Sequence, residues 1–179
     1  MTLVLTNSLS GDREPFEPVD PGRVRMYVCG LTVSDAPHLG HARLWVQADL
    51  LHRWLEYRGY QVDHIENITD VNEKIVARIG EPGVGADEPT VAAQFTASVF
   101  AAMRLLGLRR ARSYPRVSEH RPQIVALIER LLTAGAAYEV EGSVYFDVTA
   151  FDRYGALSGV DPEEASVDQA TDTLAEKRH

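Results

Sequence analysis

The sequence has little cysteine and no long apolar runs. Cys29 is the single cysteine, which excludes a disulfide bond within the chain. No stretch reaches the roughly 20 consecutive apolar residues that a membrane-spanning helix needs. The first residues also lack the basic segment and apolar core of a secretory signal. We therefore expect a cytoplasmic protein without a membrane segment.

Positive charge is scarce as well. The 179 residues include 18 lysines and arginines against 26 aspartates and glutamates, and only Lys74 and Lys177 are lysines. The formal net charge of −8 argues against a generic nucleic-acid-binding surface, because contacts to phosphates need basic side chains. A hydrophobic fraction of 45% is ordinary for a folded protein, and the length suffices for one sizeable domain, or one domain and part of a second.

Apolar periodicity predicts that strands and helices alternate in the first part of the chain. Residues 24–28 form a short apolar run that predicts a buried strand, and residues 61–66 predict another. Between them, residues 41–57 predict a helix that ends before Gly59. A strand–helix–strand order favours a parallel sheet, so we expect an α/β fold. The apolar stripe of the predicted helix is expected to face the core, and it consists of Leu44, Trp45, Ala48, Leu51, Trp54 and Leu55.

The rest of the chain predicts three more helices and a hairpin. The helices are expected over residues 71–79, 91–106 and 123–132. Residues 137–148 predict a β-hairpin that turns at Glu141-Gly142, because tyrosine, valine and phenylalanine flank the turn. From Gly159 onward the chain is acidic and has no apolar periodicity. The inward face of the last helix is expected to consist of Ile124, Leu127, Ile128 and Leu131.

The segment that carries most chemistry is His38-Leu39-Gly40-His41, where the loop after the first strand meets the predicted helix. Unpaired N–H groups and the helix dipole favour a bound phosphate at such a position. Gly40 has no side chain, so a nucleotide can lie against the backbone there. His38 and His41 stand one turn apart, as two donors to a phosphate in a transition state would. The plainer alternative is that both histidines only cap the helix or face solvent.

These residues resemble a known family. His38-Leu39-Gly40-His41 is similar to the HIGH signature of class I aminoacyl-tRNA synthetases, and the run from Cys29 to Arg43 resembles the cysteine–tRNA ligase family in particular. The further matches follow in the family's order and are Glu66–Asp70 (ENITD), Ser118–His120 (SEH) and Gly142–Asp147 (GSVYFD). The resemblance as a whole covers about residues 5–158, which is most of the chain.

The resemblance implies an α/β fold with the Rossmann-like parallel sheet of a class I synthetase. Residues 1–100 would be the first half of the catalytic domain. Residues 101–158 would be an inserted α+β connective segment with a helix and a β-hairpin, and residues 159–179 a loosely structured acidic end.

The resemblance also implies a role for each matching residue. Cys29 would be one of four zinc ligands, and Gly30 and Thr69 would contact the substrate cysteine. ATP, with Mg²⁺, would be bound by Thr32, His38, Gly40 and His41, the two histidines being catalytic. Zinc binds thiolate tightly and the hydroxyl of serine poorly, which would select cysteine.

The implied partners are L-cysteine, ATP and tRNA(Cys), and a monomer is expected. Because the family's remaining zinc ligands would fall beyond His179, we expect the chain to be part of a longer enzyme and to be inactive alone.

Two other functions stay open. One is a related enzyme that joins cysteine to an amino sugar, as in mycothiol synthesis, although Lys74 stands where that branch tends to carry proline. The other is a non-catalytic module that binds a nucleotide or a partner synthetase. Single residues also have plainer interpretations. Cys29 would then be an inert buried thiol, and Thr69 and Asp70 would cap the helix predicted over residues 71–79. His120 is expected to be structural, and His52 and His64 are assigned no role.

Overall fold

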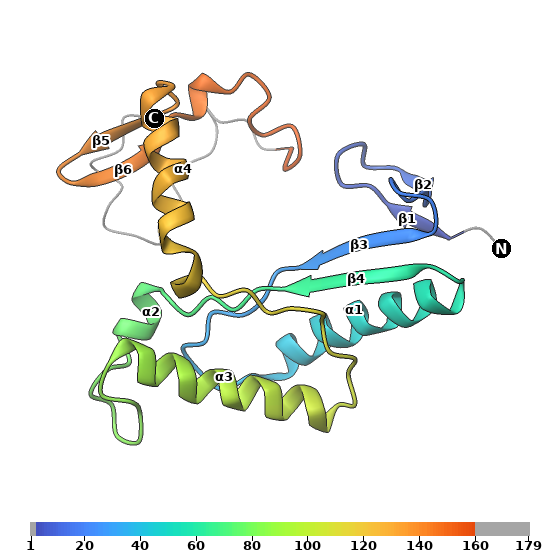
Figure 1. Ribbon diagram of the computed structural model, residues 1–179, viewed down its shortest axis with the longest axis horizontal. Helices are drawn as coiled ribbons and strands as arrows, with labels where there is room; N and C mark the ends of the chain where they lie inside the picture. The colour runs from blue at the N-terminus through green and yellow to red at the C-terminus, as the bar shows by residue number, and fades with distance from the viewer. Residues whose placement is uncertain (1–2, 160–179) are drawn as a thin grey trace. The chain divides into compact units, whose positions relative to one another are not determined.

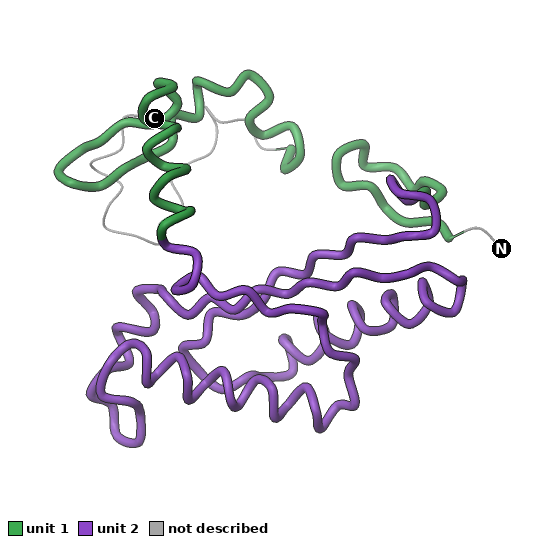
Figure 2. The backbone as a smooth tube through the Cα atoms, in the orientation of Figure 1, with its two compact units in different colours: residues 1–17, 122–179 green, residues 18–121 purple. Residues whose placement is uncertain are grey.

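The computed structural model describes residues 3–159 of the chain. It forms two compact units (Figure 2): one is Pro18–Arg121, and the other combines Met1–Glu17 with the chain from Pro122 onward. The two units are defined by which residues contact one another. The predicted limits at residues 100 and 158 instead separate a catalytic part from a connective part, so the two divisions are not directly comparable. Those limits stay predictions. The acidic end predicted over residues 159–179 lies, apart from Gly159, outside the described residues.

The unit Pro18–Arg121 is built on a parallel βαβ arrangement. Strand β3 (Arg23–Val28) pairs in parallel with β4 (Gln61–Glu66), and α1 (Leu39–Tyr57) connects them (Figure 1). In the register of this pair, Val28 lies opposite Glu66, so both strands end at the same level. The parallel pair and both strand positions confirm the predictions from periodicity.

Residues 112–117 run along the other edge of β4, which was not predicted. The N–H of Arg112 donates to the carbonyl of His64 at 2.7 Å, and the N–H of Ile68 donates to the carbonyl of Pro115 at 2.9 Å. Parallel bridges join Ile65 to Ser113 and Ile68 to Arg116. Strand β4 therefore lies in the middle, with β3 on one side and residues 112–117 on the other.

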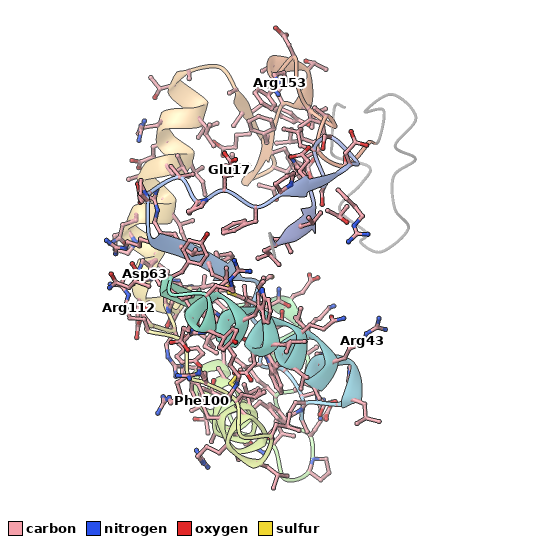
Figure 3. The ribbon with its side chains drawn as sticks, turned by 90° about the vertical axis from the view of Figure 1, so that its right-hand side faces the viewer. Glu17, Arg43, Asp63, Phe100, Arg112 and Arg153 are labelled. Carbon is pink, nitrogen blue, oxygen red and sulfur yellow. The ribbon has the colours of Figure 1, made fainter. Side chains whose placement is uncertain are left out.

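The side chain of Asp63 ties these three segments together. Asp63 is buried and forms ion pairs with Arg23 of β3 and, at 3.3 Å, with Arg112. The proximity of Asp63 and Arg112 is visible in Figure 3. Both arginines hold the pKa of Asp63 below its usual value, Arg23 through its hydrogen bond being the larger cause.

The main core lies where α1 and α3 (Glu88–Leu105) meet on one side of the strands (Figure 1). Trp45 is 3% exposed and belongs to this core, as predicted, whereas Trp54 is 39% exposed and the prediction for it was wrong. The predicted stripe was wider than the face that packs, so Trp54 lies at its margin, where its ring stacks with Arg58. The buried core cluster comprises Val33, Trp45, Ile68, Ile75, Val91, Ala92, Phe95, Val99 and Met103.

All four predicted helices have slightly different limits in the structure, and two of them differ by three residues at one end. The helix predicted over residues 71–79 is only α2 (Glu73–Val76), because Asn72 caps it with a side-chain oxygen that accepts from the N–H of Lys74. After Val76 the backbone continues as turns with bonds three residues back. Helix α3 begins before the predicted residue 91, because Asp87 caps it by accepting from the N–H of Thr90 at 2.8 Å.

The second unit contains two antiparallel hairpins and a helix. Its elements are β1 (Val4–Thr6), β2 (Arg13–Pro15), α4 (Arg121–Thr133), β5 (Ala137–Val140) and β6 (Ser143–Phe146). The predicted hairpin is confirmed, since Glu141 and Gly142 both have positive φ, as a two-residue type I′ turn requires.

The predicted burial of the α4 face was wrong. Ile124 is 40% exposed and Leu127 is 52% exposed. An amphipathic pattern becomes buried only where another layer covers it, and the described residues of this unit bury no side chain fully. Among the described helices of both units, none is long and apolar enough to cross a bilayer.

Candidate functional site

The chain leaves β3 at Cys29, whose side chain is exposed. Its thiol points toward the carbonyl oxygen of Gly30 at 3.7 Å. The interpretation of Cys29 as an inert buried thiol is therefore wrong. An exposed thiol at the end of a parallel strand is free to react or to bind a metal.

Gly30 fits closely against the end of β4. Its N–H donates to the side-chain oxygen of Asn67 at 2.8 Å, and a Cβ built on Gly30 would lie 1.5 Å from the Asn67 carbonyl oxygen. No side chain fits in this space, so only glycine allows the two segments to approach. Asn67 belongs to the ENITD motif, but the sequence alone did not predict a role for it.

The ladder between the two strands continues into the loops. The N–H of Thr69 donates to the carbonyl of Leu31 at 3.0 Å, and the N–H of Val33 donates to the carbonyl of Thr69 at 3.1 Å. Thr32 and Thr69 form a parallel bridge. The structure thus brings Gly30, Thr32 and Thr69 together at the carboxyl end of the sheet, where open α/β folds bind ligands.

Two contacts hold the loop that follows. Val33 is fully buried in the core, and Arg78 binds the carbonyl of Ser34 at 3.3 Å and the carboxylate of Asp35 at 2.9 Å. The N–H of Ala36 and the Arg78 guanidinium together hold the pKa of Asp35 below its usual value. These contacts fix the segment that delivers His38 to the start of α1.

His38 and His41 form a reciprocal cap at the N-terminus of α1. The N–H of Gly40 donates to Nδ1 of His38 at 3.1 Å, and the N–H of His38 donates to Nδ1 of His41 at 3.2 Å. The rings stack with centroids 3.8 Å apart. The interpretation as helix caps is therefore confirmed, and it does not compete with a role in binding.

The caps determine which nitrogen of each ring carries the proton. Because Nδ1 accepts a backbone N–H in both rings, a neutral imidazole must carry its proton on Nε2. Burial and the neighbouring His38 lower the pKa of His41, which keeps that ring neutral at pH 7. Both histidines therefore have an Nε2–H group available as a hydrogen-bond donor.

Asp70 does not cap a helix over residues 71–79, because Asn72 does so for α2. The buried Asp70 carboxylate accepts instead from the N–H and the hydroxyl of Ser118, and it pairs with Arg116 at 3.7 Å. Two of the recognised motifs, ENITD and SEH, thus meet in one network. His120 hydrogen-bonds the carbonyl of Arg116 at 2.7 Å, consistent with a structural role.

Sequence reasoning missed a row of buried polar groups on β4. The side chains of His64 and Glu66 are buried and face α1. The Nδ1 atoms of His64 and His52 are 3.3 Å apart. The carboxylate of Glu66 accepts from the indole N–H of Trp45 at 3.0 Å. Burial raises the pKa of Glu66 to about 7, although the bond from Trp45 opposes the shift. The sequence could have revealed this pair, because His64 and Glu66 are two residues apart, and residues with that spacing lie on the same face of a strand.

No cluster of three or more histidine, cysteine, aspartate or glutamate side chains suited to a metal occurs within residues 3–159. Cys29 is thus a single candidate ligand. Its exposure and its thiol fit a zinc site that other residues would complete.

Comparison with known proteins decides the family. The sequence family described as "tRNA synthetases class I (C) catalytic domain" matches residues 15–179. The chain belongs to this family. It is 57% identical over 179 residues to the cysteine–tRNA ligase of Halobacterium salinarum, matching 100% of this chain and 36% of that protein. It is 46% identical over 164 residues to the cysteine–tRNA ligase of Pyrococcus horikoshii, matching 92% of this chain and 34% of that protein.

Solved class I synthetases share the fold. The methionyl-tRNA synthetase of Mycobacterium tuberculosis, solved with methionyl-adenylate, gives a TM-score of 0.54 at 17% identity and covers 68% of this chain and 28% of its own. A putative arginyl-tRNA synthetase of Campylobacter jejuni gives 0.52 at 15% identity, covering 75% of this chain and 39% of its own. The chain therefore has the mixed α/β fold of class I catalytic domains, and it spans about a third of the length of the curated relatives.

Proposed function

We propose that the complete protein activates L-cysteine with ATP and transfers it to tRNA(Cys). The observation that carries the proposal is that Gly30, Thr32 and Thr69 meet at the carboxyl end of β3 and β4, from which the loop leads directly to the His38–His41 cap. Membership of the family and the names of the relatives support it. In the first step the cysteine carboxylate attacks the α-phosphate of ATP, forming the adenylate and releasing pyrophosphate. In the second, a hydroxyl at the tRNA 3′ end attacks the adenylate carbonyl and releases AMP.

His38 and His41 are proposed to bind the ATP phosphates through their Nε2–H groups. The Nδ1 atoms are engaged in the caps, so these donors are fixed in direction before ATP binds. Fixed donors stabilise the charge that develops on the phosphate without any rearrangement during the reaction. Gly40 is proposed to give the nucleotide access to the backbone, and Thr32 to bind the same phosphates. Mg²⁺ is expected to accompany ATP.

Gly30 and Thr69 are proposed to contact the substrate cysteine, and Cys29 to be one ligand of a zinc ion beside it. When bound, zinc would supply a Lewis acid that takes the substrate sulfur as thiolate and rejects serine. The chain's own contribution is the exposed Cys29 thiol and, at the next residue, the close contact between Gly30 and Asn67. The other ligands are proposed to lie beyond His179.

The finer architecture belongs to the same proposal. We take β3, α1 and β4 as the first half of a Rossmann-like catalytic domain, with a connective α+β segment that contains α4 and the β5–β6 hairpin. The complete protein is expected to be a cytoplasmic monomer.

Cysteine-dependent exchange of pyrophosphate into ATP by the complete gene product, with zinc and magnesium present, tests the proposal. We expect exchange with cysteine and far less with serine at equal concentration. Charging of tRNA(Cys) rather than an amino sugar then identifies the acceptor. No exchange with cysteine would refute the proposal.

A further inference from the structure

A buried hydrogen bond joins α1 to the end of β4. Oε1 of Glu66 accepts from Nε1–H of Trp45 at 3.0 Å, and the two residues are 4% and 3% exposed. A carboxyl group in this setting costs free energy unless a partner compensates it. The bond therefore fixes the distance between α1 and β4 at this point.

Each end of the bond lies next to one part of the candidate site. Trp45 follows His41 by one turn of α1, and the two rings have centroids 6.2 Å apart. Glu66 directly precedes Asn67, whose side chain holds the N–H of Gly30. The rings of His38, His41 and Trp45 and the Glu66 carboxylate thus form a row from the helix cap to the end of β4, where the backbone continues to Asn67 and its contact with Gly30.

The neighbours of Glu66 leave Trp45 as its structural partner. A small cavity beside it is lined by Asp49 of α1, His64 of β4, and Arg109 and Tyr114 of the segment after α3. Arg109 pairs with Glu56 at 3.1 Å, and its N–H donates to Asp49 at 2.7 Å. The Tyr114 hydroxyl accepts from the N–H of Ala111 at 3.0 Å. Arg109 and Asp49 therefore have partners of their own. Among the described residues, Nε2 of the buried His64 has no hydrogen-bond partner, and the charge of Glu66 helps to raise the pKa of Tyr114, after burial as the main cause.

We propose that Glu66 is a positioning residue that, through Trp45, sets the place of His38 and His41 relative to the Gly30–Asn67 contact. Glu66 does not touch the substrates in this proposal. Its effect on catalysis rests on the proposed function, whereas its effect on the position of the helix cap does not. Because burial raises the pKa of Glu66 to about 7, its carboxyl group loses its proton near neutral pH. The acceptor of the Trp45 indole N–H then changes from a neutral to a charged oxygen, and this change can be followed by experiment.

NMR of the ¹⁵N-labelled 179-residue chain tests the link. The indole signals of Trp45 and Trp54 are assigned with a Trp54→Phe variant. Between pH 5 and 9, the Trp45 indole signal is expected to shift with a midpoint near 7, together with the amide signals of Gly40 and His41. In Glu66→Gln the carbonyl oxygen still accepts from Trp45 but cannot titrate, so the shift of the Trp45 indole signal should vanish while the spectrum stays native. The Gly40 and His41 amide signals should then keep only the pH-dependent shifts that the His41 ring itself causes.

Further variants separate positioning from general destabilisation. Glu66→Ala and Trp45→Phe remove the bond and should displace the Gly40 and His41 amide signals at every pH. Trp54→Phe is the matched control, since it makes the same change on the same helix at a more exposed position. If Glu66→Ala fails to fold, the NMR titrations of wild type and Glu66→Gln still test whether Glu66 positions the cap. Cap signals that titrate identically in these two proteins would overturn the proposal.

Kinetics of the complete gene product distinguish this proposal from the proposed function. Glu66→Ala should lower kcat for pyrophosphate exchange by on the order of 10²-fold, as a misplacement of about 1 Å does. Glu66→Gln should recover most of the loss, and Trp54→Phe should match wild type. No exchange in wild type refutes the proposed function alone. Wild-type kcat in both Glu66→Ala and Trp45→Phe refutes positioning alone.

Discussion

At the scale of single residues, Glu66 makes stability depend on pH in a direction opposite to most carboxyl groups. Its pKa rises from 4.5 to about 7 on folding, so between these values the native state binds more protons than the unfolded state. Stability from this group is fully present below about pH 4.5 and is lost as the pH rises to 7. The shift corresponds to roughly 3 kcal/mol.

Glu66→Gln should remove that dependence. We expect the variant to gain stability relative to wild type as the pH rises from 4.5 to 8, by up to about 3 kcal/mol. Urea unfolding of both proteins at pH 4.5, 6 and 8 measures the difference and cancels the titration of all other groups. A constant difference across the three pH values would show that the Glu66 carboxyl is not perturbed.

Gly30 is the residue at which backbone packing is tightest. Gly30→Ala places a Cβ against the Asn67 carbonyl, where the built distance is 1.5 Å, so the two loops must separate. We expect the free energy of unfolding to fall by about 1–3 kcal/mol, as at other overpacked sites. Gly40→Ala is the comparison, because its Cβ would meet only the His38 ring, at 2.9 Å, and a side chain can move. Equal unfolding midpoints for the two variants would contradict this account.

At the scale of elements, the first turn of α1 combines a structural and a proposed catalytic role in His38. The first turn has no acidic residue, so the reciprocal histidine cap carries the stabilisation of that end. His38→Ala should cost roughly 0.5–2 kcal/mol, whereas His38→Asn keeps an efficient N-cap and should cost far less.

The same pair of variants separates the two roles. Asparagine lacks the Nε2–H donor at the position proposed for the phosphates, so both variants should lose pyrophosphate exchange in the complete gene product. Thermal unfolding and exchange assays together check the prediction. Wild-type exchange in His38→Asn would show that His38 does not bind ATP. Wild-type stability in His38→Ala would show that its cap does not stabilise the helix.

The elements that sequence predicted well are those with local signals. Strands β3 and β4 and the hairpin at Glu141-Gly142 follow from periodicity and turn chemistry within a few residues. The edge segment 112–117 was missed because it has little apolar alternation and is held by bonds to β4. Burial of Trp54 and of the α4 face failed for a related reason, since periodicity identifies an apolar face but not the layer that covers it.

The candidate site shows the same limit. The loop with Cys29 and the histidine segment follow from the motif, and the structure adds how the parts are held. Gly30 meets Asn67 37 residues away, and Trp45 meets Glu66 21 residues away, so neither pairing has a local signature. The plainer interpretation of Asp70 as a cap for the next helix is wrong, because its carboxylate binds Ser118, 48 residues along the chain.

At the scale of the whole molecule, burial is concentrated in one unit. Every fully buried side chain among residues 3–159 lies between Val24 and Ala111, within Pro18–Arg121. We therefore expect residues 18–121 to fold alone, with cooperative unfolding and the NMR spectrum of the same residues in the longer chain. Residues 122–159 alone should lack a cooperative transition. A disordered spectrum for residues 18–121 would show that the core needs the other unit.

Zinc binding tests how much of the proposed metal site this chain contains. Residues 3–159 offer Cys29 but no cluster of three ligands, and a single thiolate holds zinc weakly compared with a complete tetrahedral set. The 179-residue chain should therefore lose zinc to a moderate chelator, whereas the complete gene product should retain one ion that Cys29→Ser weakens. Metal analysis after dialysis against the chelator measures both. Tight, stoichiometric zinc in the 179-residue chain that disappears in Cys29→Ser would place the missing ligands within this chain, and the proposal of ligands elsewhere would then be wrong.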